Sequence, residues 1–267
     1  MNEMKGNSMA VFNSNDIYPV SADSELPFEQ HRDIFHLTGI DQEETILLLY
    51  PPSKDDKTRE ILFIRKSDNH TKVWEGEKLS KKQANELSGI DSIYFIDDFK
   101  DILSSIATKV DTFYINKNEH YRANSPVETR EDRFISWLLK KYPAHNVAKS
   151  NPILQRQRSI KHPDEIDQIK KACDITRKGF NRVLEFIKPN VWEYEIEAEF
   201  IHEFINSSSK GFAYSPIIAS GNDNNVLHYV KNNKQCKSGE LILMDVGAEY
   251  GNYSSDMTRT VPVSGKF

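Results

Sequence analysis

The 267-residue chain has little cysteine, only Cys173 and Cys236, and neither has a cysteine or histidine nearby at metal-ligand spacing. A disulfide framework is therefore excluded, and a reducing compartment is expected. The sequence has no apolar run near the roughly 18 residues of a membrane span and no apolar stretch typical of a signal peptide. We therefore expect a cytoplasmic protein with no membrane partner.

A surplus of positive charge is also absent, since 35 Lys and Arg residues face 40 Asp and Glu residues and the formal net charge is -5. Proteins that bind a nucleic-acid backbone usually carry excess basic residues on one face, so we expect no nucleic-acid partner. With 11 Gly and 11 Pro the chain is neither collagen-like nor of low complexity. Its length fits one large domain or two small ones.

In the first half of the chain, short runs of branched apolar residues alternate with helical patterns, which is typical of an α/β layer arrangement. The predicted strands span 44–50, 59–66, 92–96 and 112–116, and the predicted helices span 80–89, 99–107 and 129–141. In the last helix Phe134, Trp137 and Leu138 fall on one face.

The stretch 145–163 has no sustained period and contains Pro152, so we place the domain boundary there and expect domains at 1–150 and 151–267. A long helix is predicted to start at Pro163, followed by a second amphipathic helix. Strands are then predicted at SPIIAS, at VLHYV and in the 240–263 region, which indicates an α+β second domain.

Asp245 and Asp256 are the most informative candidates for chemistry. Asp245 ends the apolar strand ELILMDV, where a lone carboxylate needs a cation, a metal ion or several hydrogen-bond donors. A strand, turn and strand can bring Asp256 to face it, and two convergent oxygen donors suit a hard divalent cation. The spacing alone equally allows Asp245 to cap a turn while Asp256 pairs with Arg259.

His228 lies in VLHYV between apolar neighbours. A histidine in such a run is more often a satisfied core residue than a catalyst. If it faces the same cleft as the aspartates, it could donate a hydrogen bond to a substrate carbonyl or to a developing oxyanion.

Several strings resemble the Xaa-Pro aminopeptidases (aminopeptidase P) of the creatinase, prolidase and methionine-aminopeptidase superfamily. In the second half these are His228-Tyr229, the string DVGAEYGNYSSDMTRTVPVSGKF that starts at Asp245, and RSIKHPDEI at 158–166. In the first half they are PFEQHRDIFHLTG, VWEGEKL and NKNEHYR. The resemblance implies an α/β N-terminal domain, with a mixed sheet and flanking helices, followed by the first half of an α+β pita-bread catalytic domain.

The resemblance also assigns roles to individual residues. Asp245 and Asp256 match two of the family's five metal ligands, and Asp256 matches the ligand that bridges two ions. His228 matches the substrate-side histidine, Tyr214 an aromatic residue lining the site, and Thr258 a hydroxyl that holds a ligand carboxylate in place.

Three further residues match positions that approach the substrate cleft in some relatives, within the subunit or from a neighbouring one. These are Asp33, Trp74 and Arg158. Packing and local capping are equally good explanations for Trp74 and Asp33, and Arg158 could simply tie the linker to the catalytic domain.

The implied reaction is hydrolysis of the bond between an N-terminal residue and a following proline. The implied cofactors are two divalent ions, most often Mn²⁺, which lower the pKa of a water between them. The implied partners are peptides with proline at the second position, and full-length relatives are expected to form homo-oligomers. Because proline has no N–H, its ring must be recognised by shape.

The family's remaining ligands, one histidine and two glutamates, lie in the second half of the pita-bread domain, beyond the position matched by Phe267. We therefore expect weak metal binding at best and little or no peptidase activity from this polypeptide alone. A fragment is the favoured interpretation, and a split gene with a complementing chain is the alternative.

Two other functions remain open at this point. One is a non-catalytic pita-bread module that binds peptides or proteins, although such relatives commonly lose the metal aspartates. The other is a prolidase-like dipeptidase or a creatinase, which shares the fold and the ligands.

Overall fold

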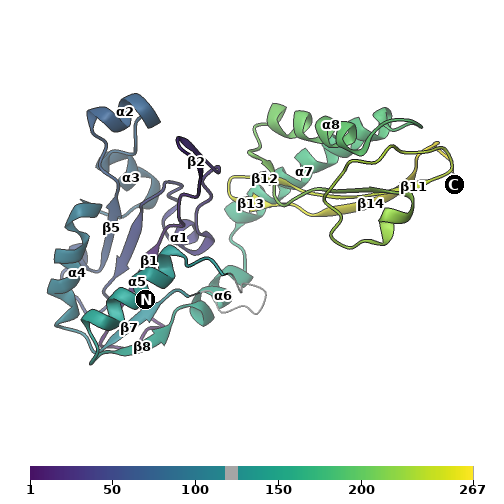
Figure 1. Cartoon of the computed structure of the whole chain (residues 1–267). Coiled ribbons are helices and arrows are strands. Elements are labelled where there is room, and N and C mark those ends of the chain that lie inside the picture. Colours follow the sequence, from purple (N-terminus) through teal and green to yellow (C-terminus); the bar gives the residue numbers. More distant parts are fainter. Residues whose placement is uncertain (118–125, 267) are drawn as a thin grey trace. The chain divides into compact units, whose positions relative to one another are not determined.

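The computed structural model describes residues 1–117 and 126–266. The chain forms two compact units, Met1–Ile160 and Lys161–Phe267, and each has a core of its own (Figure 1). Within the described residues, no helix is both long and apolar enough to cross a membrane. Most of the NKNEHYR string at 116–122, and Phe267, lie outside the described residues.

The first unit is built on a six-stranded sheet in the order β6-β5-β4-β1-β7-β8. The strands are β1 (Ser8–Asn13), β4 (Ile46–Leu49), β5 (Glu60–Ile64), β6 (Ser92–Phe95), β7 (Thr112–Ile115) and β8 (Asn146–Lys149). The β1–β4 and β4–β5 pairs are antiparallel and the other three are parallel, which confirms the predicted mixed sheet.

Helices cover both faces of this sheet. On one face, α4 (Phe99–Ala107) and α5 (Arg130–Lys141) contribute core residues such as Leu103 and Leu138. On the other face, core residues come from α1 (Arg32–Thr38), α3 (Lys81–Ser88) and α6 (Asn151–Ser159). Because successive strand residues point to opposite faces and both faces are covered, all six residues of β1 are buried.

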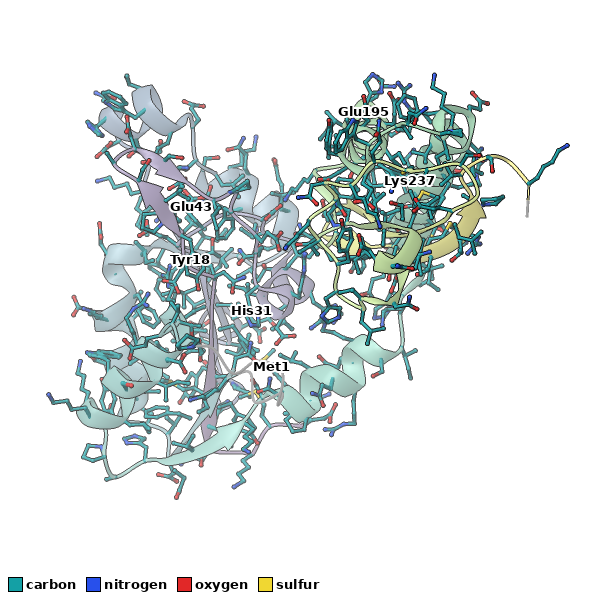
Figure 2. All side chains as sticks on the ribbon, turned by 45° about the vertical axis from the view of Figure 1, so that its right-hand side comes forward. Met1, Tyr18, His31, Glu43, Glu195 and Lys237 are labelled. Carbon is teal, nitrogen blue, oxygen red and sulfur yellow. The ribbon has the colours of Figure 1, made fainter. Side chains whose placement is uncertain are left out.

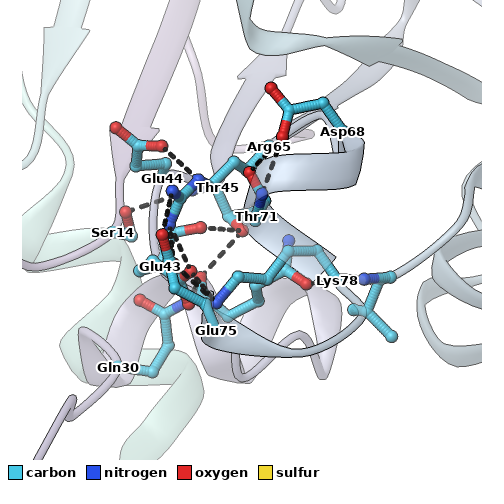
Figure 3. A network of polar contacts seen from close by, with 12 residues as sticks. Ser14, Gln30, Glu43, Glu44, Thr45, Arg65, Asp68, Thr71, Glu75 and Lys78 are labelled. Atoms are coloured by element: carbon cyan, nitrogen blue, oxygen red, sulfur yellow. Dashed lines mark hydrogen bonds and ion pairs between the residues drawn. The ribbon is translucent and has the colours of Figure 1, made fainter. Parts of the chain in front are cut away.

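A short helix, α2 (Asn69–Glu75), is tied to this unit by ion pairs (Figure 3). The Arg65 guanidinium donates to both carboxylate oxygens of Glu75, at 2.6 and 2.8 Å, and to Glu43 at 3.0 Å. Burial acts to raise the pKa of Glu43, but hydrogen bonds from Lys78 and Arg65 outweigh it and leave the pKa below its ordinary value. This cluster fixes α2, whose Trp74 side chain is exposed.

Smaller elements complete the first unit. They are the hairpin of β2 (Pro19–Ser21) and β3 (Ser24–Glu25) and the 3-10 turns η1 (Asp56–Thr58) and η2 (Ile96–Asp98). The first unit ends at Ile160, ten residues beyond the expected boundary at 150. The added residues form α6, whose Leu154 is buried in the first unit's core.

The second unit places two helices on one face of a three-stranded sheet (Figure 1). The helices are α7 (Pro163–Phe186) and α8 (Glu193–Asn206), and the strands are β10 (Ile217–Ser220), β11 (Leu241–Val246) and β14 (Met257–Pro262). As predicted, α7 starts at Pro163 with acidic residues in its first turn. Glu195, labelled in Figure 2, accepts a hydrogen bond from the Trp192 amide at 2.7 Å and caps the start of α8.

A second small sheet of the order β13-β12-β9 extends the unit. Its strands are β9 (Gly211–Phe212), β12 (Ala248–Tyr250) and β13 (Tyr253–Ser254). The core between helices and sheets is formed by side chains such as Phe200, Phe204 and Met244.

The prediction of a strand at VLHYV is wrong. The 3-10 turn η4 (Gly221–Asn225) is followed by irregular chain through residue 234. Val226, Leu227 and Val230 are all exposed, and only Tyr229 is buried, where it packs with Ile217 and Ala219 of β10 and with Leu243 of β11.

Candidate metal and substrate site

The alternation of β11 places Asp245 on the face of the sheet away from the helices. Ile242, Met244 and Val246 are fully buried, whereas Asp245 is half-buried. Since side chains alternate along a strand, the apolar positions pack on the helices and Asp245 faces the other way. The predicted semi-buried aspartate at the strand end is therefore observed.

Asp256 lies on the same face. In the antiparallel β11–β14 pair, Thr258 is directly opposite Asp245, and Asp256 stands two residues before Thr258. Two residues are one full period of a strand, so Asp256 is the diagonal neighbour of Asp245.

The hydroxyl of Tyr214 joins the two carboxylates. It lies 2.7 Å from Asp245 Oδ1 and 3.0 Å from Asp256 Oδ1. Burial raises the pKa of Tyr214 far above its ordinary value, and the hydrogen bonds to the two aspartates raise it further. Because a phenol has one proton, the two oxygens share a single donor, and both carboxylates converge on one point.

Gly247 makes this convergence possible, and the sequence analysis missed it. A Cβ at Gly247 would lie 1.9 Å from the carbonyl oxygen of Ser255 and 3.1 Å from Cε1 of Tyr214. The backbone carrying Asp256 and the tyrosine ring therefore both pack against the glycine's bare Cα. An isolated glycine between two strand segments is the signal that could have revealed this close approach.

Two buried hydroxyl groups fix the backbone where it approaches Gly247. The Oγ atoms of Thr176, from α7, and Ser255 lie 2.6 Å apart, and both are 2.9 Å from the amide nitrogen of Ala248. The Ala213 amide also donates to the Gly247 carbonyl at 2.8 Å, next to Tyr214. Helix α7 and the strand ends thus fix the backbone on each side of the acidic pair.

The acidic pair opens into a cavity of about 580 Å³. Its wall is formed by Tyr214, Ser215, Ile217, Leu227, His228, Val230, Asp245 and Asp256. The structure therefore brings four of the predicted site residues together, and His228 is exposed at the wall rather than packed in the core.

The oxygens of the pair suit a divalent cation. Two carboxylate oxygens lie within hydrogen-bond distance of the same atom, and within residues 1–117 and 126–266 neither aspartate has a lysine or arginine within ion-pair distance. Hard cations prefer such oxygen donors. Among the same residues no third carboxylate, imidazole or thiolate completes a metal-binding group, so this part of the chain supplies two ligands.

The alternative in which Arg259 neutralises Asp256 does not match the geometry. Arg259 Nη1 donates to the backbone oxygen of Thr258 at 2.7 Å, and the antiparallel register places Arg259 opposite Met244. Thr258 faces Asp245 across the strand pair, but within the described chain its hydroxyl makes no hydrogen bond to either aspartate. Its role in holding a ligand stays a prediction.

The other three predicted residues belong to the first unit. Asp33 is buried, and its carboxylate accepts hydrogen bonds from Arg158 Nη1 at 2.7 Å and from Asn116 Nδ2 at 3.0 Å. This pair connects α1 with the end of α6 inside the first unit, so it does not show the alternative in which Arg158 ties the linker to the catalytic domain. Trp74 is 74% exposed on α2. The approach of these three residues to a substrate stays a prediction.

Comparison with known proteins adds two family matches. Residues 1–114 match the family model "Aminopeptidase P, N-terminal domain", and residues 167–267 match "Metallopeptidase family M24". The Xaa-Pro aminopeptidase of Escherichia coli is 31% identical over 253 residues, which is 92% of this chain and 56% of the relative. Human Xaa-Pro aminopeptidase 3 is 30% identical over 95% of this chain and 50% of the relative. The chain thus spans about half the length of these relatives.

Solved structures show the same similarity. Zinc-substituted E. coli aminopeptidase P in complex with product superposes with a TM-score of 0.87 at 29% identity, over 99% of this chain and 60% of that one. Proline aminopeptidase P II from Yersinia pestis gives a TM-score of 0.87 at 29% identity, over 99% and 61% of the two chains.

Proposed function

Because the chain belongs to the aminopeptidase P family, with its N-terminal domain and part of its M24 metallopeptidase domain, we propose that the second unit carries part of an Xaa-Pro aminopeptidase active site. The reaction is hydrolysis of the peptide bond between an N-terminal residue and a following proline. The convergence of Asp245 and Asp256 on the Tyr214 hydroxyl, at the wall of a cavity, carries this proposal.

Each residue has a distinct part in the proposed reaction. Asp245 and Asp256 would hold the divalent ions, with Mn²⁺ as the preferred metal, and Tyr214 keeps the two carboxylates aligned. Bound ions would polarise the scissile carbonyl and favour deprotonation of water near neutral pH. His228 would donate a hydrogen bond to the substrate carbonyl from the cavity wall.

The cavity also supports recognition of proline. Ile217, Leu227 and Val230 line it beside His228. Apolar side chains can pack against a pyrrolidine ring, which offers no N–H for a hydrogen bond. The apolar wall would therefore recognise the ring of the peptide's second residue by its shape, and His228 would bind the carbonyl of the first residue.

The proposal is tested by peptide binding with Mg²⁺ or Mn²⁺ present. We expect an Xaa-Pro-Xaa tripeptide to bind more tightly than the matched Xaa-Ala-Xaa tripeptide, and His228→Ala to remove most of that difference. Equal affinities for the two peptides would contradict the proposal. With only two metal ligands in the described residues, we expect weak Mn²⁺ binding and little turnover, so sub-micromolar Mn²⁺ affinity or rapid hydrolysis would overturn the second expectation.

The location in the cytoplasm, the absence of membrane and nucleic-acid partners, and the formation of homo-oligomers stay predictions.

A further inference from the structure

The segment 226–231 carries His228 but contributes little to the core. Leu227 is 89% exposed, Val226 and Val230 are about half exposed, and Tyr229 is the only one of these residues that is buried. The segment forms no helix or strand, so no backbone ladder fixes the imidazole, and the apolar contact of the segment with the sheet is made by Tyr229, which packs with Ile217, Ala219 and Leu243.

Tyr229 anchors this segment to α8. Its hydroxyl donates to Glu193 Oε2 at 2.7 Å, and both side chains are buried. Burial raises the pKa of Tyr229 to about 12, with a further contribution from the Glu193 carboxylate, so the phenol stays a donor at neutral pH. The anchor is thus the residue next to His228.

The buried Glu193 carboxylate accepts hydrogen bonds from the segment and from the residues on both sides of it. Its side chain has no exposed surface, and its Oε1 accepts from the amide and the hydroxyl of Ser220, both at 2.8 Å. Oε2 accepts from Tyr229 and from the Lys234 amide at 2.9 Å. Ser220 precedes the segment and Lys234 follows it, so one carboxylate binds both ends and the middle. Its place in the first turn of α8 favours the negative charge.

One turn further along α8, Glu197 binds Asn232, the residue that follows the segment. Asn232 Nδ2 donates to Glu197 Oε2 at 2.8 Å and to the Pro216 carbonyl at 3.0 Å. The Asn232 carbonyl oxygen accepts from the Ile218 amide at 3.1 Å. Two carboxylates on one edge of α8 thus hold the segment, one at Tyr229 and the other through Asn232 directly after it.

We propose that Glu193 and Tyr229 are positioning residues that hold His228 at the wall of the cavity, so that the buried edge of α8 sets the geometry of the substrate-side imidazole. The functional meaning of this positioning rests on the proposed peptidase site. The ordering of the segment itself does not, which allows the two ideas to be tested separately.

The test compares Tyr229→Phe with Ser220→Ala in the same chain. Each variant removes one hydroxyl donor to Glu193, but only Tyr229 lies in the segment that carries His228. Each loses one buried hydrogen bond to the same carboxylate, so both variants should lose similar stability in urea unfolding. NMR relaxation of the amides at 227–230 should show order parameters falling from about 0.85 to below about 0.6 in Tyr229→Phe, with no fall in Ser220→Ala.

Tyr250→Phe is a second control, which makes the same tyrosine-to-phenylalanine change without the loss of a hydrogen bond. No hydrogen bond is found for the Tyr250 hydroxyl within the described residues. Equal order parameters at 227–230 in wild type and Tyr229→Phe would overturn the proposal, and so would an equal loss of order in Ser220→Ala. The preference for proline peptides should fall at least several-fold in Tyr229→Phe and persist in Ser220→Ala. If wild type itself shows no such preference, the proposed function fails, while the relaxation data still decide the positioning proposal.

Discussion

At the scale of single residues, the acidic pair depends on a position with no side chain. Gly247 packs its Cα against the Ser255 carbonyl oxygen and the Tyr214 ring, and a Cβ there would overlap the oxygen at 1.9 Å. The obstacle is backbone, held by the buried hydroxyls of Thr176 and Ser255, so it has little room to move.

We therefore expect Gly247→Ala to lower the unfolding free energy of the second unit by about 3 kcal/mol. Urea unfolding measures the loss, and Gly6→Ala is the control, because its Cβ would meet no atom within 4 Å. If Gly247→Ala were as stable as Gly6→Ala, the close approach of the two strand segments would be wrong.

A second residue-scale prediction concerns pH. Burial lowers the pKa of His31 below its ordinary value; Asp33 opposes this, and Arg158 and Arg32 add to it. Below about pH 6.5 the unfolded chain therefore binds more protons at His31 than the folded chain does. The stability that the neutral, buried His31 gives the folded chain is lost as the pH falls through that value. The neutral ring also accepts a hydrogen bond from the Asp33 amide at 3.2 Å, which caps α1.

His31→Asn keeps a capping acceptor but does not titrate. Urea unfolding at pH 7.5 and 5.5 should therefore show a larger loss of stability in wild type than in His31→Asn. The same loss in both proteins would show that His31 is not the titrating group.

At the scale of elements, the packing of α7 on α8 depends on Gly179. A Cβ at Gly179 would lie 2.7 Å from Cε1 of Phe204 and 2.9 Å from Cδ1 of Phe200, and both phenylalanines are fully buried. Alanine gains about 1 kcal/mol of helix propensity over glycine, but overpacking costs about 1–3 kcal/mol.

We expect Gly179→Ala to destabilise the second unit by up to about 2 kcal/mol, since the rigid rings leave no free space. Thermal unfolding measures it, with Cys173→Ala, an exposed site on the same helix, as the neutral control. A gain in stability for Gly179→Ala would mean that the two helices lie further apart than described.

The elements best predicted from the sequence are those with a strong local period. The helix expected at 99–107 is α4 with the same bounds, because its apolar spacing and its burial agree. The central strand β1 was missed because SMAVFN contains a single β-branched residue, Val11, and so lacks the branched apolar run by which strands were recognised. VLHYV was misjudged because Leu227 and Val230 are exposed at the wall of the cavity instead of paired in a sheet.

At the scale of the whole molecule, the two units have separate cores. Leu103 belongs to a core of the first unit and Phe200 to that of the second. We expect calorimetry to resolve two unfolding transitions, with Leu103→Ala lowering one and Phe200→Ala lowering the other. Each substitution should cost about 2–5 kcal/mol. A single transition lowered equally by both variants would contradict this.

The acidic pair could be predicted from strand alternation and from the short return between Asp245 and Asp256. Tyr214 could not, because it joins them from 31 residues away from Asp245 and no local pattern reports such a contact. It was expected only through resemblance to a family, and Glu193 was not expected at all. Buried polar contacts between distant segments depend on the complete fold.

The central claim is that Asp245 and Asp256 form one cation-binding point beside Tyr214. Paramagnetic broadening by substoichiometric Mn²⁺ in NMR spectra of the chain tests it most directly, because it detects weak binding. We predict selective broadening around residues 214, 228, 245 and 256, and its loss in the Asp245→Asn/Asp256→Asn double variant. Broadening that persists in the variant, or that centres on another acidic cluster such as Glu43 and Glu75, would contradict the account.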